Sequence, residues 1–385
     1  MSIFITGASG FLGSHLLAQL LKQGHHCFAH VRCVNKTTGR EKILRALSAA
    51  TDLHTIAVEQ LEVIPGDVTA PMLGMMPHDL DNVLHHCDEF IHCAAIVRFD
   101  APYQQAYEVN VTGTKALLAI AERRQYVAGL KRVDIVSTAY IAGTATGEIL
   151  EAAPLPETGF RNSYEASQHQ AELYVLEKMS QLPITVFRPS IIIGEAGDGK
   201  TSQFTAIHGL LKFYARGQWR ILPANRHTPI DLVTVDYVRD ALLEIRKQPE
   251  SIGEFLHLCA GKNNVLSIAE IVETAQLHCR KAKRVIYHPV FLWLKIMLPL
   301  LTLMERVLPL TTISRVLPVL RAYLPYTRRN PLFNDDKAQK LLHGSTIRQA
   351  NIHAVIDDVF DYAITSDFGN TLSEMKSNAT VIVEG

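Results

Sequence analysis

The sequence has no excess of either charge and no long uninterrupted apolar run. Its 385 residues carry 38 Lys and Arg against 38 Asp and Glu, a formal net charge of +0 at pH 7. A neutral chain offers no electrostatic footprint for nucleic acid, so we expect no nucleic-acid partner. Charges and prolines interrupt every apolar run before the roughly 18 residues that a membrane-spanning helix needs. The length allows a large core, in one domain or in two fused ones.

The sequence also lacks the spacings that bind metals and a segment that directs secretion. Its six cysteines form no Cys-x-x-Cys pair or zinc-finger spacing, so buried free thiols in a reducing compartment are expected. The pairs His25-His26 and His85-His86 are adjacent in sequence, and adjacent residues rarely converge on one ion. An apolar strand is predicted almost at Met1, which leaves no room for a signal peptide. We therefore expect no metal and a cytoplasmic location.

What the sequence does have is a glycine-rich turn close to its start. The run over 6–13 follows the apolar residues 3–5 and opens an amphipathic stretch over 12–21, which predicts a strand, a tight turn and a helix. The first glycine permits the turn, the second lets the backbone approach a pyrophosphate, and the third lets the helix pack on the strand. The phosphates would lie at the positive amino end of the helix. The predicted dinucleotide contacts in this turn are Thr6, Gly7, Gly10, Phe11, Leu12 and Gly13.

Short apolar strands alternate with helical stretches as far as about residue 195. This alternation predicts an α/β fold with a parallel, doubly wound Rossmann sheet and helices on both of its faces. Ligands of such sheets bind at the carboxyl ends of the strands. The strands are predicted at 3–5, 27–31, 61–64, 89–93, 133–137 and 185–188.

The pattern loosens after Gly194, and a second lobe is predicted to be interleaved with the first. A helix over 236–247 and a strand over 254–259 return to the sheet. The predicted domains are a dinucleotide-binding domain at 1–195 plus about 229–260, a smaller, mainly helical substrate lobe at about 196–228 plus 261–365, and a mobile polar tail at 366–385.

Residues 280–330 combine many cations with many apolar residues. Ten Lys or Arg residues and one acid, Glu305, lie in this region, and Leu-Pro pairs recur through it. Short amphipathic helices are predicted, which would cap an oily substrate channel or lie on an anionic membrane surface. An ordinary helical subdomain with buried leucines and a solvated basic face is the alternative.

Two further segments, taken with the glycine turn, give the sequence a family resemblance. The segment 163–167 (Ser-Tyr-Glu-Ala-Ser) precedes a helical pattern, and the segment 136–143 ends a strand. In this order they resemble the extended short-chain dehydrogenase/reductase family over roughly residues 1–260. Asn110 falls where that family carries a structural asparagine of the cofactor site. The resemblance implies further cofactor contacts at Asp67, Val68, Cys93, Ala94, Ala95, Pro189, Ser190 and Ile191.

Within that family the sequence looks most like the reductases of acyl thioesters. These are the thioester-reductase domains of carrier-protein systems and the fatty acyl-CoA reductases, with a male-sterility-type NAD-binding domain. The segments that suggest this branch are 10–13, 31–32, 92–95, 137–143 and the oily, basic C-terminal region. Sugar-nucleotide epimerases and hydroxysteroid dehydrogenases share most of the same motifs.

The resemblance implies a carbonyl that accepts a hydride, with Tyr164 and Thr138 beside it. The carbonyl oxygen gains negative charge and needs hydrogen-bond donors, one of which must deliver a proton. Tyr164 is the expected proton donor and Thr138 the second donor. Taken singly, Tyr164 also fits a partly buried tyrosine bonded to backbone, and Thr138 fits a threonine of a strand-end turn.

The sequence departs from the family four residues after the tyrosine, where Gln168 replaces the expected lysine. That lysine normally lowers the pKa of the tyrosine and holds the cofactor ribose. Glutamine can still bind ribose hydroxyls but brings no charge. A phenol with a pKa near its reference value of about 10 is a usable acid for carbonyl reduction and a poor base for alcohol oxidation. Gln168 therefore favours reduction, and loss of efficient turnover is the harsher alternative.

An acid is also missing at the end of the second strand, where NAD sites usually place one for the ribose. The segment is 29–32, Ala-His-Val-Arg, followed by Lys36. A cation suits the 2′-phosphate of NADP, so Arg32 favours NADPH; a solvated loop arginine is the alternative.

These patterns together predict an NADPH-dependent reductase of an acyl thioester carried on CoA or on a carrier protein. The product would be an aldehyde and, after a second hydride, an alcohol. An epimerase or 3β-hydroxysteroid-type dehydrogenase on the same scaffold, and a nucleotide-binding protein without turnover, are the alternatives. Peripheral membrane contact through 280–330 and a homodimer remain open.

Overall fold

The computed structural model describes residues 1–155, 159–204, 206–217, 221–284, 286–291 and 323–369. The chain divides into two compact units, each described here by itself. Unit 1 takes the described residues of Met1–Ser190, Asp236–Cys259 and Phe333–Ile347, and unit 2 those of Ile191–Val235, Ala260–Leu332 and Arg348–Gly385.

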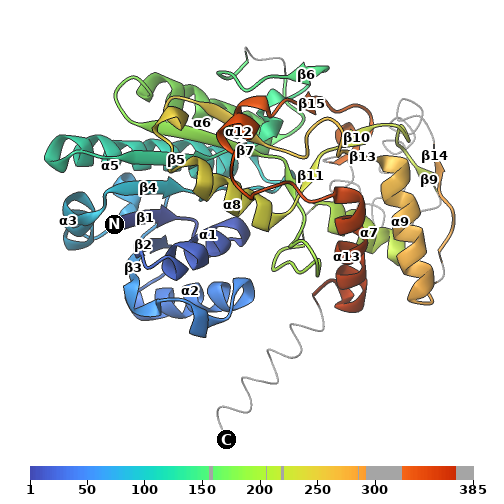
Figure 1. Cartoon of the computed structure of the whole chain (residues 1–385), viewed down its shortest axis with the longest axis horizontal. Coiled ribbons are helices and arrows are strands. Elements are labelled where there is room, and N and C mark those ends of the chain that lie inside the picture. Colours follow the sequence, from blue (N-terminus) through green and yellow to red (C-terminus); the bar gives the residue numbers. More distant parts are fainter. Residues whose placement is uncertain (156–158, 205, 218–220, 285, 292–322, 370–385) are drawn as a thin grey trace, which may run out of the picture. The chain divides into compact units, whose positions relative to one another are not determined.

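A seven-stranded sheet with the order β12-β7-β5-β4-β1-β2-β3 forms the centre of unit 1 (Figure 1). Every neighbouring pair is parallel, and the chain reverses its direction of winding between β1 and β4. The predicted doubly wound Rossmann class is therefore confirmed. The strands are β1 (Ser2–Thr6), β2 (His26–Val31), β3 (Leu61–Pro65), β4 (Glu89–His92), β5 (Arg132–Val136), β7 (Ile184–Pro189) and β12 (Phe255–Leu258).

Apolar side chains on both faces of the strands explain why this sheet is covered on both sides. Successive residues of a strand point to opposite faces. Phe4 and Phe90 point into one hydrophobic cluster, whereas Ile3 and Ile5 are fully buried on the other face. Strands that are apolar at successive positions are typical of parallel sheets between two layers of helices.

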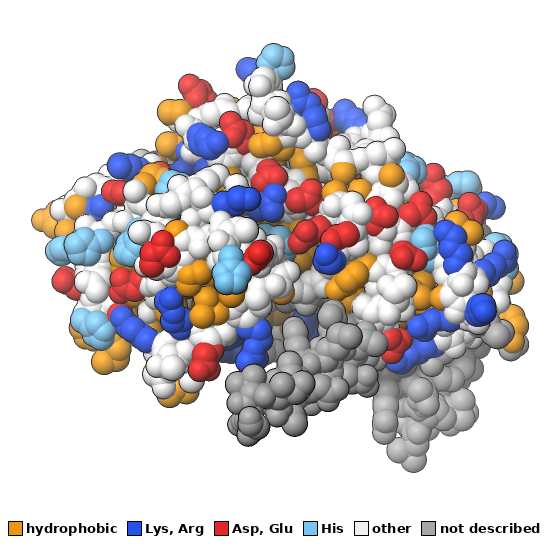
Figure 2. Space-filling view, turned by 60° about the horizontal axis from the view of Figure 1, so that its bottom comes forward, with side chains coloured by type: hydrophobic (Ala, Val, Ile, Leu, Met, Phe, Trp, Pro, Cys, Tyr) orange, Lys and Arg blue, Asp and Glu red, His pale blue; other side chains and the backbone are white. Residues whose placement is uncertain are grey.

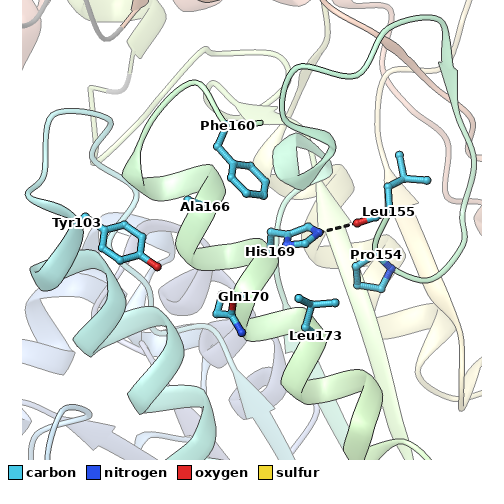
Figure 3. Close-up of a pocket in the computed structure, with 8 residues that line it drawn as sticks. All are labelled: Tyr103, Pro154, Leu155, Phe160, Ala166, His169, Gln170 and Leu173. Carbon is cyan, nitrogen blue, oxygen red and sulfur yellow. Dashed lines mark hydrogen bonds between the residues drawn. The ribbon is translucent and has the colours of Figure 1, made fainter. Parts of the chain in front are cut away.

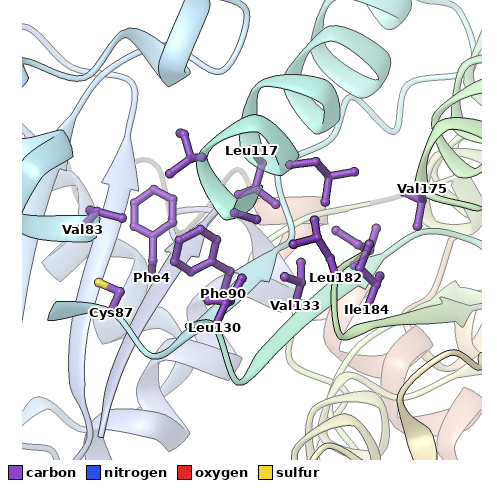
Figure 4. Close-up of a cluster of buried hydrophobic side chains, with 14 of the residues drawn as sticks. Phe4, Val83, Cys87, Phe90, Leu117, Leu130, Val133, Val175, Leu182 and Ile184 are labelled. Atoms are coloured by element: carbon purple, nitrogen blue, oxygen red, sulfur yellow. The ribbon is translucent and has the colours of Figure 1, made fainter. Parts of the chain in front are cut away.

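The cluster on the first face is shared with α3, α5 and α6, which contribute Val83, Leu117 and Val175 among others (Figure 4). Helix α1 contributes nothing to it and buries Leu16 and Leu20 elsewhere, on the second face. The helices of unit 1 are α1 (Phe11–Lys22), α2 (Lys36–Ala50), α3 (Pro77–His86), α4 (Tyr103–Tyr107), α5 (Gly113–Ala128), α6 (Ser163–Lys178), α8 (Val235–Ile245, whose first residue falls in unit 2) and α12 (Asp336–Leu341).

The described residues of unit 2 form helices around a second core and several short strand pairs. Leu211, Cys279 and Phe360, one from each of three helices, are buried in this core. The helices are α7 (Ala206–Ala215), α9 (Ile268–Lys281) and α13 (Ile352–Thr365). The strand pairs are β8 (Ile191–Ile192) with β11 (Leu232–Val233), β9 (Ile221–Leu222) with β14 (Val290–Phe291), and β10 (Pro229–Ile230) with β13 (Leu266–Ser267).

Residues 333–347 group with unit 1, although the sequence placed them in the substrate lobe at 261–365. The ring of Phe333 meets that of Tyr140 edge-on, with centroids 5.4 Å apart. The carboxylate of Glu151 accepts hydrogen bonds from two backbone N–H groups at the start of α12. These partners lie far apart in sequence, so no local pattern announces them. Phe333 ends β15 (Leu332–Phe333, at the boundary of the units), which pairs with β6 (Glu148–Ile149), and Glu151 follows β6.

Two predicted segments fall largely outside the described residues. Most of the apolar basic region 280–330 (292–322) and most of the tail (370–385) are among the residues not described, so the amphipathic helices and the mobile tail stay predictions. Within the described ranges, no helix has both the length and the hydropathy to cross a bilayer. Within the same ranges, no cluster of three or more His, Cys, Asp or Glu residues could hold a metal ion. Figure 2 shows acidic and basic side chains interspersed over the face that it presents.

Candidate active site

Glycines of the turn between β1 and α1 occupy places where a side chain would not fit. Gly7 has φ of +73°, and a Cβ there would lie 2.5 Å from the backbone carbon and oxygen of Cys93. A Cβ on Gly13 would overlap the carbonyl of Gly7. The N–H of Gly10 donates to Gly7 O at 2.8 Å and closes the turn. The turn therefore depends on glycine at these positions.

The turn ends at an amino terminus of α1 that has no side-chain cap. Gly10 is the N-cap and has no side chain, and the first turn, which includes Phe11 and Leu12, carries no acidic residue. The unsatisfied N–H groups and the positive end of the helix dipole attract an anion. The arrangement fits the pyrophosphate of a dinucleotide.

The cation predicted to select the cofactor follows β2 and is exposed. Arg32 makes no side-chain hydrogen bond or ion pair to any residue that the structure describes. Lys36 is instead paired with the buried carboxylate of Asp79, at 2.8 Å. The pKa of Asp67 is lowered chiefly by the N–H of Thr69, and the Arg32 guanidinium adds to this effect. Arg32 is thus an exposed cation, without a close ion pair among the described residues, on the side of the sheet where β2 and β3 end.

Predicted contacts also follow β4. Cys93, Ala94 and Ala95 are half-buried there, and burial raises the pKa of the Cys93 thiol to about 12. The side chain of Asn110 is bonded to the backbone N–H and C=O of Ile96, at 2.8 and 3.1 Å. Asn110 therefore holds the segment after β4 in place, as the structural asparagine of the family would.

The structure places Thr138 close enough to Tyr164 for its side chain to lower the pKa of the phenol. Tyr164 lies in the first turn of α6, whose N-cap is Asn162. Thr138 follows β5 and caps a short 3₁₀ helix, where its Oγ1 accepts the N–H of Tyr140 at 3.2 Å. Thr138 Oγ1 also donates to the carbonyl of Pro189 at 3.4 Å. Two hydroxyls from separate elements thus converge at the carboxyl end of the sheet.

The phenol of Tyr164 lies in an apolar environment. Its ring stacks on that of Phe99, with centroids 5.9 Å apart and planes at 26°. Burial raises the pKa of Tyr164 to about 12, against the smaller lowering effect of the hydrogen bond with Thr138. The hydroxyl is therefore protonated at neutral pH and can act as a proton donor.

Gln168 lies one turn beyond Tyr164, on the same face of α6. Its side chain is only 6% exposed. It forms no hydrogen bond with any described residue. Its amide donors and acceptor are therefore available to a bound ligand.

Two serine hydroxyls at the ends of β5 and β7 are also unsatisfied. The side-chain oxygens of Ser137 and Ser190 are buried and have no partner among the described residues. Ser190 was among the predicted contacts, whereas Ser137 was missed; its place directly before Thr138 was the available signal. With Gln168, these orphaned groups fit a polar ligand such as the ribose and carboxamide of a nicotinamide nucleotide. Ile191, another predicted contact, begins β8 in unit 2.

A pocket of ≈ 460 Å³ opens on the face of α6 that lies opposite Tyr164 and Gln168 (Figure 3). His169 Nε2 donates to the carbonyl of Leu155 at 2.7 Å, so this ring is turned away from Tyr164, as its helical position predicts. Neither Tyr164 nor Gln168 lines this pocket. Its lining consists of Tyr103, Pro154, Leu155, Phe160, Ala166, His169, Gln170 and Leu173.

Sequence reasoning missed two buried carboxylates that hold α6 and the loop before it. Glu172 on α6 pairs with Arg188 on β7 at 2.5 Å. Glu151, in the loop, accepts the N–H of His257 at 2.8 Å, and burial raises its pKa to about 7. Their partners are distant in sequence, so no local signal identifies either residue.

Comparison with known families agrees with this geometry. The family model described as male sterility protein, an NAD-binding domain, matches residues 5–242. The chain belongs to the male sterility protein family. The match covers the glycine turn, Thr138, Tyr164 and Gln168, and it supports a nicotinamide dinucleotide as the cofactor class.

This member of the male sterility protein family is also similar to curated proteins and to solved structures. The aldehyde reductase lnaA of Aspergillus flavus is 29% identical over 269 residues, 66% of this chain and 25% of the relative. Fatty acyl-CoA reductase 1 of Xenopus laevis is 28% identical over 282 residues, 63% of this chain and 53% of the relative. The chain thus spans between a quarter and about half of these curated relatives. The terminal R domain of the myxalamid PKS-NRPS pathway shares the fold, with a TM-score of 0.81 at 22% identity, covering 95% of this chain and 91% of that one.

Proposed function

We propose that the protein reduces an acyl thioester, carried on CoA or on an acyl-carrier protein, with NADPH. The observation that carries the proposal is the hydroxyl pair of Tyr164 and Thr138 at the carboxyl end of the sheet, beside the unsatisfied amide of Gln168. The names of relatives support the substrate class, since they include fatty acyl-CoA reductases and an aldehyde reductase.

NADPH, when bound, supplies the hydride. The chain's own residues act on the other side of the carbonyl: Thr138 and Tyr164 hydrogen-bond its oxygen, and Tyr164 transfers its proton as negative charge develops there. The hemithioacetal then collapses, and the C–S bond breaks to release a thiol and an aldehyde. A second round on the aldehyde gives the alcohol. Gln168 would hold the ribose hydroxyls through its amide.

The raised pKa of Tyr164, about 12, suits the role of an acid in reduction. At pH 7 roughly one molecule in 10⁵ would carry the phenolate, so Tyr164 is an acid in almost every molecule. Alcohol oxidation needs the phenolate as a base. The absence of an ammonium at position 168 therefore favours reduction over dehydrogenation.

The choice of NADPH rests on the exposed guanidinium of Arg32 and on the lack of an acid at the end of β2. A 2′-phosphate would form charge-assisted bonds with this cation, whereas NADH offers only hydroxyls. Replacing Arg32 by Glu should weaken NADPH binding far more than NADH binding.

The proposal extends to the carrier of the substrate, the role of the region 280–330 and the location of the protein. A carrier protein or CoA would present the thioester, and the region 280–330 would shield the acyl chain or rest against a membrane surface. A cytoplasmic location belongs to the same proposal. None of these depends on the chemistry of Tyr164.

The test is NADPH oxidation by the purified protein with a panel of acyl-CoA and acyl-carrier substrates, with Tyr164→Phe as the control. Turnover with thiol release supports the proposal. Turnover only with ketones or secondary alcohols would favour the dehydrogenase or epimerase alternative on this scaffold. Tight NADPH binding without turnover of any carbonyl would favour a nucleotide-binding protein.

A further inference from the structure

A continuous chain of buried hydrogen bonds runs through unit 1 from β1 to α6. It begins at Thr6, whose Oγ1 lies 2.7 Å from Nδ1 of His92. Nε2 of the same ring lies 3.2 Å from Oγ1 of Thr114 on α5. His92 ends β4, so one imidazole joins the centre of the sheet to the helix that covers it. All members of the chain are buried: Thr6, His92, Thr114, Asn110, Ser167 and Tyr164.

The second half of the chain reaches the first turn of α6. Thr114 Oγ1 donates to the carbonyl of Asn110 at 2.6 Å. The Asn110 amide donates to Ser167 Oγ at 2.9 Å, and Ser167 Oγ donates to the carbonyl of Tyr164 at 3.0 Å. Asn110 lies in a π-helical turn, Glu108–Thr112, between α4 and α5. Such turns are rare and are frequent at functional sites.

The directions of these bonds fix the tautomer of His92. A carbonyl can only accept, so the single proton of the Thr114 hydroxyl is committed to Asn110. Thr114 Oγ1 must then accept from Nε2–H of His92. In a neutral ring Nδ1 is therefore the acceptor, and Thr6 is its donor. Burial lowers the pKa of His92 to about 4, so the ring stays neutral near physiological pH.

The two ends of the chain are the two halves of the candidate site. Thr6 is the first residue of the glycine turn, and Gly7 follows it against the backbone of Cys93. The other end is the backbone of Tyr164, one residue from the N-terminus of α6. The spacing between a pyrophosphate on the turn and the phenol of Tyr164 thus depends on bonds made by His92.

We propose that His92 is a positioning residue, held as the Nε2–H tautomer, that sets the placement of the Tyr164 hydroxyl relative to the glycine turn. The inference rests on the proposed function in one respect, since it takes Tyr164 as the proton donor. A buried histidine that only filled space would satisfy its nitrogens locally. This ring instead bonds Thr6 at the glycine turn and Thr114 on α5, from which Asn110 and Ser167 continue the chain to α6.

Two substitutions cut the chain on opposite sides of the ring. His92→Asn keeps an acceptor near Nδ1 for Thr6 and loses the donor to Thr114. His92→Gln keeps a donor near Nε2 and loses the acceptor for Thr6. We expect His92→Asn to lower kcat about 10- to 100-fold with KM and the Kd of NADPH within about twofold, because misplacement by an ångström has effects of this size. We expect His92→Gln to raise the Kd of NADPH about fivefold or more and to lower kcat less.

Thr114→Val should reproduce the loss in kcat, because it removes the same link without touching the ring. Thr185→Val is the matched control: Thr185 is also fully buried with two hydrogen bonds, and it is not a member of the chain. Both threonine variants should lower the melting temperature, but only Thr114→Val should lower kcat. Equal kcat values for the two variants, or identical effects of His92→Asn and His92→Gln on kcat and on the Kd of NADPH, would overturn the proposal.

A measurement without substrate separates this proposal from the proposed function. Long-range ¹H–¹⁵N correlation spectra of ¹⁵N-histidine-labelled protein should show His92, identified by its loss in His92→Asn, as the neutral Nε2–H form from about pH 5.5 to 8.5. The Nδ1–H form or a cationic ring would refute the proposed role of His92 in the hydrogen-bond chain. If the wild type turns over no thioester, the proposed function fails, while the NADPH Kd and the tautomer still decide the role of His92.

Discussion

Strands β5 and β7 carry polar groups at both ends, and the two ends differ in how those groups are satisfied. At the amino ends, Arg132 Nε donates to Asp134 at 2.7 Å and its Nη2 donates to Thr185 Oγ1 at 2.7 Å. Arg246 Nε donates to the second oxygen of Asp134 at 2.7 Å, and its Nη2 donates to Glu89 at 2.7 Å. These five residues are called the amino-end network, and their charges are paired.

At the carboxyl ends of the same strands, two buried hydroxyls have no partner among the described residues. Ser137 and Ser190 follow β5 and β7, and Gln168 lies on the adjoining helix. They are called the carboxyl-end group, together with the Tyr164–Thr138 pair. A fully paired network specifies and stabilises a fold, whereas unpaired buried groups lower stability until a ligand satisfies them. The difference distinguishes the paired end of the sheet from the end at which we propose that the cofactor and substrate bind.

The largest expected effect comes from Tyr164→Phe, which removes the proposed proton donor of the carboxyl-end group. We expect kcat for thioester reduction to fall about 10²- to 10⁴-fold, the range for loss of a general acid. The melting temperature should change little, because the ring and its stacking on Phe99 remain. Steady-state NADPH oxidation and thermal unfolding measure the two quantities. An unchanged rate would remove Tyr164 from the mechanism.

Asp134→Ala should have the opposite effects, a large loss of stability with little change in kcat, because it breaks the amino-end network. Asp134 is fully buried and bonds two arginines, so its loss leaves buried charges without compensation. We expect the free energy of unfolding in urea to fall by about 3 to 5 kcal/mol. The value of kcat per folded molecule should stay within about twofold. A large loss in kcat with intact stability would contradict the separation of the two ends.

Glu151 is a buried carboxyl that accepts hydrogen bonds and yet has a raised pKa. Its folded-state pKa is about 7 against an ordinary value of 4.5, so between these pH values the folded protein keeps a proton that the unfolded chain has lost. Stability should therefore fall as pH rises from about 4.5 to 7, by up to about 3 kcal/mol. Urea unfolding at several pH values measures this slope. Glu151→Gln should flatten it, and an unaltered slope in that variant would assign the effect to another group.

Gln168→Lys would restore a cation beside Tyr164. An ammonium favours the phenolate, so the pKa of Tyr164 should fall, by about 1 to 3 units for a nearby opposite charge. Each unit multiplies the phenolate fraction at neutral pH tenfold, so NADP-dependent oxidation of the product alcohol should rise at least about tenfold. The alkaline limb of the reduction rate should move to lower pH. An unchanged pH profile would place the new ammonium away from the phenol. Gln168→Leu is the uncharged control and should not raise the oxidation rate.

The smallest expected effects come from Ser137→Ala and Ser190→Ala. Since neither hydroxyl has a partner in the described part of the chain, its removal should not lower the stability of the free protein and should raise it slightly. The Kd of NADPH should rise by a factor of about 2 to 10, the value of one lost hydrogen bond. Thr185→Val, in the amino-end network, should instead lower stability by about 1 to 3 kcal/mol with no change in this Kd. Equal changes in stability and in the Kd of NADPH for the three variants would contradict the difference between the two ends of the sheet.

The sheet could be predicted because each strand is a short apolar run of its own. The seven runs need no distant partner to be recognised, and their alternation with helices allows few topologies. The glycine turn was predictable for a related reason: it is a local strand-turn-helix whose spacing reflects backbone geometry. The replacement of the family lysine by Gln168 stays a prediction, made from its position four residues after Tyr164.

What escaped prediction depends on partners that are distant in the chain. Lys36 follows Arg32 closely, and only the structure shows that it is paired with Asp79. The orphaned state of Ser137 is a property of its surroundings and not of its residue type. Glu151 finds its donors on β12 and α12, more than a hundred residues away. Sequence patterns predict elements, whereas hydrogen-bond satisfaction is decided only when the elements have packed.

The return of residues 333–347 to unit 1 has a practical consequence for anyone preparing the nucleotide-binding half alone. A fragment that stops at residue 260 would contain every strand of the sheet and every residue of the Tyr164 site. It would also expose the Tyr140 ring and leave the Glu151 carboxylate without the donors of α12. Such a truncation should express poorly or aggregate, and a version that fuses 333–347 back through a short linker should be soluble.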